Sequence, residues 1–293
     1  MPKPISHAPP PGSATTLPHV WWDGQLRPEA EALIPAISQG LLWGRGLFET
    51  IAVREGLPFA LTRHLDRFRS GAARLALQPP DDSILRGAIT AVLANAPPEG
   101  HRLRITLTGG ESFGLVLTPE PGHLLIRLTP VSPGATQVSL LTVPWRRNEF
   151  SPLSGLKCTS YAENALALAW AIERGATEGL FLNSAGDLCE GTVSNLFLVR
   201  GGTVLTPAIG SGCLPGITRS LILDLASQLG LPCIQKALTP ADLAAADEVF
   251  LTNSIHGVRP AASCDRHHFH CPGPVTLQLT AALEDMRQRL PDP

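Results

Sequence analysis

Two short strings, far apart in the chain, constrain this protein more than any other feature. Residues 155–164 (GLKCTSYAEN) contain a lysine, Lys157, with no other charged residue within five positions. Residues 190–197 (EGTVSNLF) begin with a glutamate and continue with small, polar and apolar residues. A lysine among uncharged neighbours is partly removed from water, which favours its neutral, nucleophilic form. The fold therefore has to place two groups: an activated amine and the carboxylate that begins segment 190–197.

Two further strings are of the type that binds a phosphate. Residues 214–219 (LPGITR) end a loop and start a predicted helix, whose first N–H groups form an anion site. Residues 252–254 (TNS) end a predicted strand and offer hydroxyl and amide groups. A nucleophilic amine, a carboxylate for a ring nitrogen and two phosphate loops are the parts that pyridoxal phosphate (PLP) requires. Together the four strings predict a PLP enzyme.

Composition excludes several other classes of protein. The chain has 293 residues and a net charge of -2, which gives no basic surface for nucleic acid. There is no apolar run of membrane-spanning length, and no apolar leader follows Met1. Six scattered cysteines without a Cys-x-x-Cys pair favour free thiols in a reducing compartment. We therefore expect a cytoplasmic protein that acts on a small molecule and binds neither nucleic acid nor membrane.

The hydrophobic patterns predict an α+β protein of two domains, without alternating βαβ units. A disordered tail is expected over residues 1–18, a small first domain over 19–131 and a larger PLP-binding domain over 135–293, with 132–134 as linker. The predicted strands are 19–22, 46–53, 58–61, 103–108, 124–128, 138–143, 178–183, 195–199, 204–205 and 248–252. The predicted helices are 62–77, 81–95, 160–174 and 217–229, and a loop is predicted for 144–155.

In this order the strings resemble those of the class IV aminotransferase family, the PLP enzymes of fold type IV. The resemblance extends over residues 20–285 and includes segments 40–50 (GLLWGRGLFET) and 64–68 (HLDRF). It implies a two-domain fold like that of D-amino acid aminotransferase, with PLP between the domains, and a homodimer. The family includes branched-chain and D-amino acid aminotransferases, (R)-selective amine transaminases and 4-amino-4-deoxychorismate lyases.

The resemblance also assigns roles to residues. Lys157 is expected to bind PLP covalently and to act as general base and acid, and Glu190 to keep the pyridine nitrogen protonated. The other residues expected at the cofactor are Arg67, Tyr161, Ser194, Asn195, Gly216, Ile217, Thr218, Thr252 and Asn253. Two of these roles have a plainer alternative: Arg67 as a helix arginine paired with Asp66, and Glu190 as a solvated carboxylate at a hairpin end.

Three features favour the lyase branch of the family. Tyr161 follows Lys157 by four residues, residues 252–260 (TNSIHGVRP) resemble a string of aminodeoxychorismate lyases, and segment 107–115 lacks an arginine that D-amino acid aminotransferases use. We therefore expect a lyase that releases pyruvate and forms 4-aminobenzoate, a folate precursor. The alternative is an aminotransferase that acts on branched-chain or D-amino acids or amines with a 2-oxo acid acceptor. A non-catalytic protein of the same fold is disfavoured because both Lys157 and Glu190 are present.

Four arginines are candidates for binding a substrate carboxylate: Arg45, Arg104, Arg147 and Arg259. Arg45 stands where the family usually has an aspartate. The histidines and cysteines of segment 264–271 lack ligand pairs at zinc-finger spacing, so this segment is predicted to be a hairpin and not a metal site.

Overall fold

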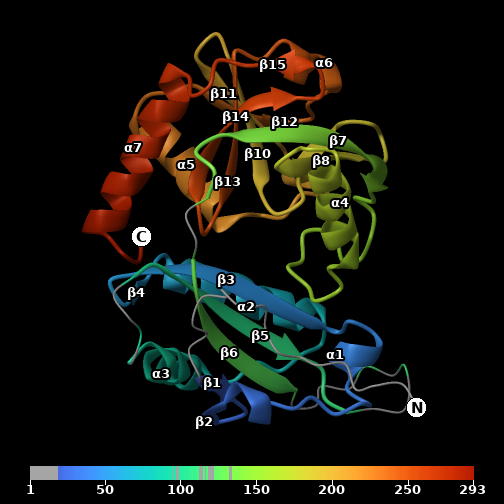
Figure 1. Ribbon diagram of the computed structural model, residues 1–293, viewed down its shortest axis with the longest axis vertical. Coiled ribbons are helices and arrows are strands. Elements are labelled where there is room, and N and C mark those ends of the chain that lie inside the picture. Colours follow the sequence, from blue (N-terminus) through green and yellow to red (C-terminus); the bar gives the residue numbers. More distant parts are fainter. Residues whose placement is uncertain are drawn as a thin grey trace.

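The computed structural model describes residues 19–293, apart from positions 95, 97–98, 112–114, 116, 118–121 and 132–133. It has two lobes, each built on one β-sheet, with the N-terminal lobe below the C-terminal lobe in Figure 1. Every strand of the first sheet precedes position 132 and every strand of the second follows it. The predicted tail and part of the predicted linker lie outside the described residues, and the domain bounds 19–131 and 135–293 stay a prediction.

The first sheet has six strands in the antiparallel order β2-β1-β6-β5-β3-β4. They are β1 (His19–Trp22), β2 (Gln25–Pro28), β3 (Gly46–Arg54), β4 (Leu57–Pro58), β5 (His101–Thr108) and β6 (His123–Pro130). Leu47, Ile51 and Leu103 pack on one face against α2 (Leu61–Arg74) and α3 (Asp82–Leu93). Because side chains alternate along a strand, Phe48 and Arg104 lie on the other face, toward the second lobe.

The second sheet has nine strands: eight follow the order β12-β11-β10-β13-β14-β7-β8-β9, and β15 pairs with β14. They are β7 (Val138–Arg147), β8 (Glu178–Asn183), β9 (Leu188–Gly191), β10 (Asn195–Arg200), β11 (Thr203–Pro207), β12 (Cys233–Lys236), β13 (Glu248–Asn253), β14 (Gly257–Cys264) and β15 (His267–His268). The helices of this lobe are α4 (Ala162–Glu173), η2 (Ile209–Ser211), α5 (Ile217–Gln228), α6 (Pro240–Ala244) and α7 (Pro274–Arg289). In the first lobe, η1 (Glu29–Glu31) and α1 (Gln39–Leu42) complete the set of described helices.

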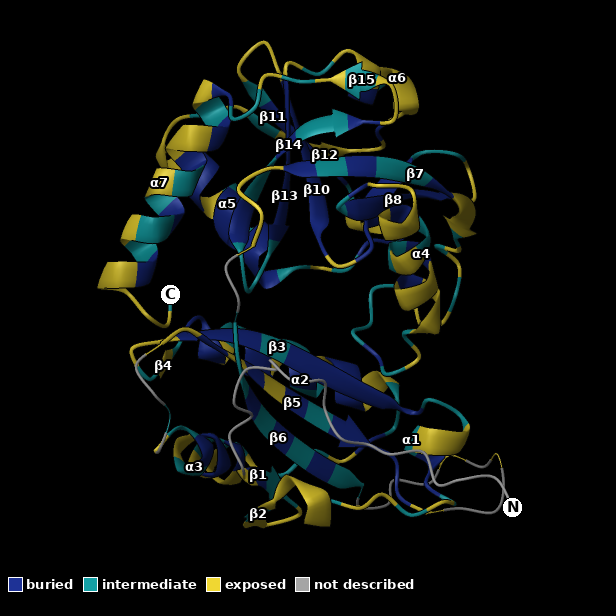
Figure 2. Ribbon diagram, in the orientation of Figure 1, coloured by how far each residue is buried: buried dark blue, intermediate teal, exposed yellow. Residues whose placement is uncertain are grey.

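The inner strands of the second sheet are buried on both faces. The side chains of β10 point to its two faces in turn. Phe197 and Val199 pack under α5 and α7, and Leu196 and Leu198 pack into the apolar core on the opposite face. Figure 2 shows β8 and β10 buried along almost all of their length. A continuous apolar run is typical of a strand covered on both sides. The core of this lobe therefore holds the ends of β9, β10 and β13 in fixed positions.

The α+β class and all four predicted helices are confirmed, with ends shifted by a few residues. The predicted strand 58–61 is wrong beyond Pro58, because α2 begins at Leu61. The predicted loop 144–155 is wrong at its start: after a register shift, Arg146 and Arg147 still pair with β8. The elements β2, β9, β12, β14, α1, α6 and α7 were not predicted.

Other expectations can be compared directly with the structure. Segment 264–271 contains the β14–β15 hairpin, and the described residues contain no group of three or more His, Cys, Asp or Glu that could hold a metal. All six cysteines are free thiols. Among the described residues, no helix is both long enough and apolar enough to cross a membrane.

Candidate active site

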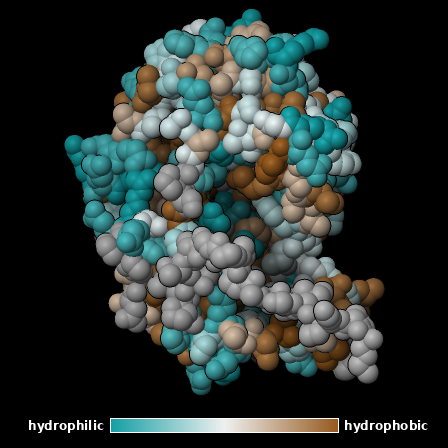
Figure 3. Space-filling model, in the orientation of Figure 1, coloured by the Kyte–Doolittle hydropathy of each residue, from teal (hydrophilic) through white to brown (hydrophobic). Residues whose placement is uncertain are grey.

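A cavity of about 590 Å³ lies between the two lobes. Figure 3 shows the face on which a hollow opens between them, with hydrophilic atoms visible inside it. β3 and β5 line the cavity from the first lobe, and segments 147–164, 190–195, 212–218 and 252–259 contribute from the second. Its volume is in the range of small-molecule sites. All four strings that were singled out in the sequence therefore reach one cavity.

Lys157 lies where the two lobes join. Its carbonyl accepts a hydrogen bond from the Phe48 N–H (2.8 Å), and the neighbouring Cys158 forms a β-bridge with Leu47. Its Nζ lies 4.5 Å from the centre of the Phe48 ring. Removal from water, together with the nearby Arg67 guanidinium, lowers the pKa of Lys157 to about 8. Roughly a tenth of this amine is therefore neutral at pH 7, far more than for an ordinary lysine, and covalent attack on an aldehyde requires the neutral form.

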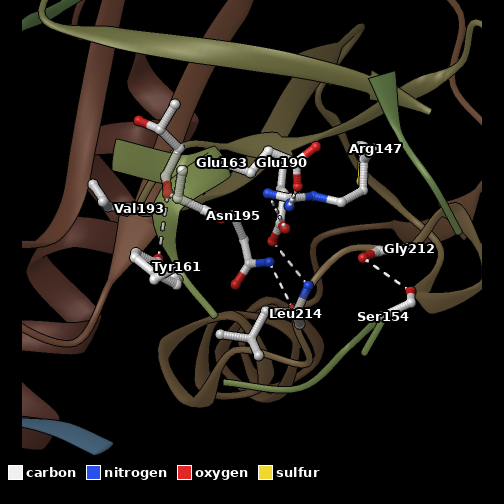
Figure 4. Close-up of polar contacts among 12 residues, drawn as sticks. Arg147, Ser154, Tyr161, Glu163, Glu190, Val193, Asn195, Gly212 and Leu214 are labelled. Carbon is white, nitrogen blue, oxygen red and sulfur yellow. Dashed lines mark hydrogen bonds and ion pairs between the residues drawn. The ribbon is translucent and has the colours of Figure 1, made fainter. Parts of the chain in front are cut away.

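Glu190 is in β9 and only 9% exposed, so it is not a solvated carboxylate at a hairpin end. Its Oε2 accepts the Leu214 N–H (2.8 Å), and its Oε1 lies 3.5 Å from the Arg147 guanidinium. Burial raises the pKa of this carboxyl, and Arg147 opposes the rise. Figure 4 shows Glu190 and Asn195 both directed at Leu214, whose carbonyl accepts from the Asn195 amide (2.8 Å). Both side chains therefore fix the loop that precedes α5.

Tyr161 lies beside Lys157 at the cavity wall. Its ring packs edge-on against Phe48, with ring centres 5.2 Å apart. Its hydroxyl and the Asn164 amide both donate to the Thr192 carbonyl, at 3.3 and 2.7 Å. Burial, helped by the negative charge of Glu190, raises the pKa of Tyr161 to about 12. The phenol therefore stays protonated and remains a hydrogen-bond donor at every physiological pH.

The two predicted phosphate loops lie at the same end of the cavity. Gly216 precedes α5, which starts at Ile217 and Thr218 and has no side-chain cap on its first N–H groups. A side-chain carbon at position 216 would collide with Oδ1 of Asn195, so any other residue there would displace this buried amide. Thr252 Oγ1 is buried without a hydrogen-bond partner among the described residues. An open helix start and an unpartnered hydroxyl fit a phosphate group.

Arg67 connects the first lobe to this end of the cavity. Its guanidinium binds both oxygens of Glu49 (2.8 and 2.6 Å) and donates to the Pro215 carbonyl (3.0 Å). It does not pair with Asp66, which binds Arg69 instead. Burial alone would raise the pKa of Glu49, but Arg67 and His64 outweigh it and lower that pKa to about 2.

Sequence reasoning did not identify Glu49 and His64, although a lone glutamate inside the apolar strand 46–53 was a signal. His64 Nδ1 lies 2.7 Å from Glu49, and its Nε2 lies 3.4 Å from the Ser254 hydroxyl. Burial lowers the pKa of His64. The three side chains thus form a buried chain of polar contacts from β3 to the 252–254 loop.

The carboxylate of Glu178, a residue that was also not predicted, forms hydrogen bonds with the turn that follows Glu190. Its carboxylate accepts from the Val193 N–H (2.9 Å), the Ser194 hydroxyl (3.2 Å) and Arg259 (3.2 Å). Asn253 donates to the same Ser194 hydroxyl (3.2 Å). Ser194 and Asn253 therefore shape the cavity wall through protein contacts.

The structure separates the four candidate arginines. Arg147 is paired with Glu163 and Glu190, and Arg259 is paired with Glu178. Arg45 does not line the cavity: its guanidinium donates to the carbonyls of Leu75 (3.0 Å) and Ala76 (2.6 Å), which corrects the expectation that it lies at the substrate. Its side chain instead joins the start of β3 to the end of α2.

Arg104 is the one predicted arginine in the cavity without a carboxylate partner among the described residues. Its Cζ lies 3.8 Å from the centre of the Phe48 ring, the same ring that Lys157 contacts. Arg102, which was not predicted, lines the same wall two residues earlier on β5 and forms no ion pair with any described residue.

Comparison with known proteins identifies the family of this chain. Residues 46–264, well over half of the chain, match the model of the amino-transferase class IV family. The branched-chain-amino-acid aminotransferase of Pseudomonas aeruginosa is 28% identical over 284 residues, which cover 91% of this chain and 92% of that protein. The aminodeoxychorismate lyase of Bacillus subtilis is 28% identical over 274 residues, which cover 90% and 92%.

A solved structure gives the same result. The T.th. branched-chain amino acid aminotransferase, determined with pyridoxamine 5'-phosphate, superposes with a TM-score of 0.86 at 29% identity and covers 94% of this chain and 95% of that chain. The lysine, the buried carboxylate and the two predicted phosphate loops around this cavity fit the same type of cofactor. The chain therefore belongs to the class IV aminotransferase family and is a PLP-dependent enzyme.

Proposed function

We propose that this enzyme is a 4-amino-4-deoxychorismate lyase. The observation that carries the proposal is the cavity wall 252–259, whose string TNSIHGVR resembles that of aminodeoxychorismate lyases. Six of its eight residues line the cavity: Thr252, Asn253, Ser254, Ile255, His256 and Arg259. Similarity to the Bacillus subtilis lyase over 90% of the chain supports the same assignment.

In this proposal residues of the second lobe, together with Arg67 of the first, hold the cofactor. Lys157 binds it covalently, and Glu190 pairs with the ring nitrogen. The phosphate is bound by Ile217 and Thr218 at the start of α5, by Thr252 and by Arg67, while the protonated hydroxyl of Tyr161 lies beside the ring. PLP, when bound, withdraws electrons from the substrate carbon that bears the amine.

Lys157 then acts as the base of the reaction. Its amine, whose pKa is lowered to about 8, takes the proton from the carbon that bears the substrate amine. The C–O bond to the enolpyruvyl group breaks, the group leaves as an enolate that takes up a proton on carbon and becomes pyruvate, and the ring becomes aromatic. Aromatisation makes the products more stable than the substrate, so the site needs few contacts beyond those that orient the substrate.

The first lobe supplies the substrate contacts. Aminodeoxychorismate carries two carboxylates, and Arg104 and Arg102 are cavity cations that no described carboxylate neutralises. Because Arg104 and Lys157 contact the same Phe48 ring, a carboxylate on Arg104 lies close to the reacting carbon. Arg102 lies roughly 7 Å further along β5 and suits the second carboxylate.

A second candidate is an aminotransferase that acts on branched-chain amino acids. The similarity to the Pseudomonas aeruginosa and T.th. enzymes favours it. Such an enzyme shares the first proton transfer, but Lys157 would then return the proton at a different carbon. It must also bind two different carboxylated partners in turn.

One assay separates the two candidates. The purified enzyme with PLP is given aminodeoxychorismate in one reaction, and L-leucine or D-alanine with 2-oxoglutarate in others. The proposal predicts 4-aminobenzoate in the first and little glutamate in the others. Rapid glutamate formation without any 4-aminobenzoate would replace the lyase with the aminotransferase.

The proposal includes a cytoplasmic homodimer. Leu33, Leu41 and Leu42, on and before α1, are exposed by 74%, 58% and 54%. A second copy that packs against α1 and the segment before it would cover these apolar side chains. Sedimentation velocity on the full chain is expected to give a dimer, and a monomer at micromolar concentration would contradict it.

A further inference from the structure

Helix α2 carries Arg67 and His64 but has no N-cap of its own. The residue before it, Ala60, has a left-handed backbone (φ 55°), and its side chain offers no hydrogen-bond acceptor. The first N–H groups of a helix need partners from outside the helix, and a missing cap destabilises the first turn. The partner of this helix start therefore has to come from another part of the chain.

Residues 291–293, which follow α7 of the second lobe, supply it. The Asp292 carboxylate accepts from the Thr62 N–H (2.8 Å) and from the Thr62 hydroxyl (2.6 Å). The Pro291 carbonyl accepts from the Ala60 N–H (2.7 Å), and the Pro293 carbonyl accepts from Arg63 Nε (2.9 Å). Figure 1 shows this end of the chain, marked C, between α7 and the first lobe. A segment of one lobe thus caps a helix of the other.

The same part of the chain also holds the 252–254 loop. Arg287 of α7, whose side chain is 2% exposed, donates to the Ser254 carbonyl (3.2 Å). On the other side of this loop, the Ser254 hydroxyl meets His64 of α2 (3.4 Å). Helix α7 with residues 291–293 therefore contacts both elements that the proposed function places around the phosphate.

We propose that Asp292 is a positioning residue for cofactor binding, because its cap holds the first turn of α2 and so keeps His64 and Arg67 in place. This inference depends on the phosphate role of Arg67 in the proposed function. Without the cap, residues 61–64 fray, His64 leaves Glu49, and Arg67 loses part of its support. Cofactor binding then has to reorder the turn, which weakens it.

A double-mutant cycle tests this coupling. The PLP concentration that half-saturates the apo-enzyme is measured for the wild type and for Asp292→Ala, Arg67→Gln and the double variant, well below their melting temperatures. We expect Asp292→Ala to raise that concentration about fivefold, the size of effect that one lost cap produces. In the Arg67→Gln background, Asp292→Ala should add less than about twofold, because both act through one guanidinium.

Two further variants distinguish positioning from general stability. Asp292→Asn should restore most of the affinity, since asparagine caps about as well as aspartate. Asp285→Ala removes an exposed carboxylate of α7 that pairs only with Arg289 among the described residues, and it should leave PLP binding unchanged. Lower thermal stability of Asp292→Ala with wild-type PLP binding would overturn the inference, as would a fivefold effect that persists without Arg67.

The same variants distinguish a wrong role for Asp292 from a wrong phosphate role for Arg67. If Arg67→Gln weakens PLP binding and Asp292→Ala does not, the inference about Asp292 alone is overturned. If Arg67→Gln binds PLP like the wild type, the phosphate role of Arg67 is wrong, and the inference is overturned with it.

Discussion

The two walls of the cavity differ in whether their charged side chains have partners of opposite charge. In the second lobe, two buried carboxylates each have an arginine partner and a backbone N–H donor. Glu190, at the cavity wall, has Arg147 and Leu214, and Glu178, which contacts wall residues but does not line the cavity, has Arg259 and Val193. On the β5 wall of the first lobe, Arg102 and Arg104 face the same cavity without a carboxylate among the described residues.

This difference indicates a division of labour. A charge that is paired and hydrogen-bonded keeps its geometry whether or not a ligand is present, which suits a permanently bound cofactor. An unpaired guanidinium gains its partner only when an anion arrives, which suits a substrate that comes and goes. We therefore interpret the second-lobe wall as the cofactor side and the β5 wall as the substrate side.

The largest effect is expected for Lys157→Ala. It removes the amine that binds PLP and moves the proton, so turnover should fall to the background rate. The chain has lysines only at positions 3, 157 and 236, which leaves no neighbour to substitute. Lys236 lies on β12 near Asp242, outside the cavity, and Lys236→Ala is the matched control. Its product formation should match the wild type.

Glu190→Gln should lower kcat by about a hundredfold to a thousandfold, as removal of one preorganised electrostatic group does elsewhere. The amide still fills the site and can accept from the Leu214 N–H, so PLP should stay bound. Glu163→Gln, which loses the other carboxylate that pairs with Arg147, should cost much less. A near wild-type kcat for Glu190→Gln would mean that this carboxylate only fixes the turn.

On the substrate side, the effect should appear in KM. Arg104→Gln should raise the KM for the dicarboxylate substrate about tenfold, and Arg102→Gln by less, because Arg104 shares the Phe48 ring with Lys157. Arg127→Gln is the matched control: it lies opposite Arg104 on β6 but is paired with Glu29. Equal effects for all three variants would remove the distinction between paired and unpaired arginines.

The smallest effect concerns pH. Since only the neutral amine attacks the aldehyde, the rate of PLP capture by the apo-enzyme should rise with pH, with a midpoint near the Lys157 pKa of about 8. Arg67→Gln removes a nearby cation that lowers this pKa, so the midpoint should move to higher pH. Stopped-flow absorbance measures both profiles, and a flat profile in this range would place the reacting amine elsewhere.

The local parts of this account were predictable from the sequence, because they depend on strings and periodicity. The lysine string, the glutamate string and the start of α5 all reach the cavity, and the apolar runs predicted most strands and helices. Partner choice was not predictable. Nothing local distinguishes Arg147, which meets Glu190, from Arg104, which meets no described carboxylate, since the pairing depends on how β5, β7 and β9 are arranged in space.

Long-range contacts account for the other errors. Arg45 was expected at the substrate, but the end of α2 supplies two carbonyls that bind it. Asp292 was not singled out in the sequence, because the helix that it caps lies 230 positions earlier in the chain. Such contacts follow from the packing of the two lobes, which no sequence window contains.

The most direct test of the central claim is to locate the cofactor. The enzyme is incubated with PLP, reduced with borohydride and digested, and the pyridoxyl group is mapped by mass spectrometry. With lysines only at 3, 157 and 236, the result is unambiguous. The account predicts the label on Lys157 alone, and a label on Lys3 or Lys236 with Lys157 unmodified would contradict it.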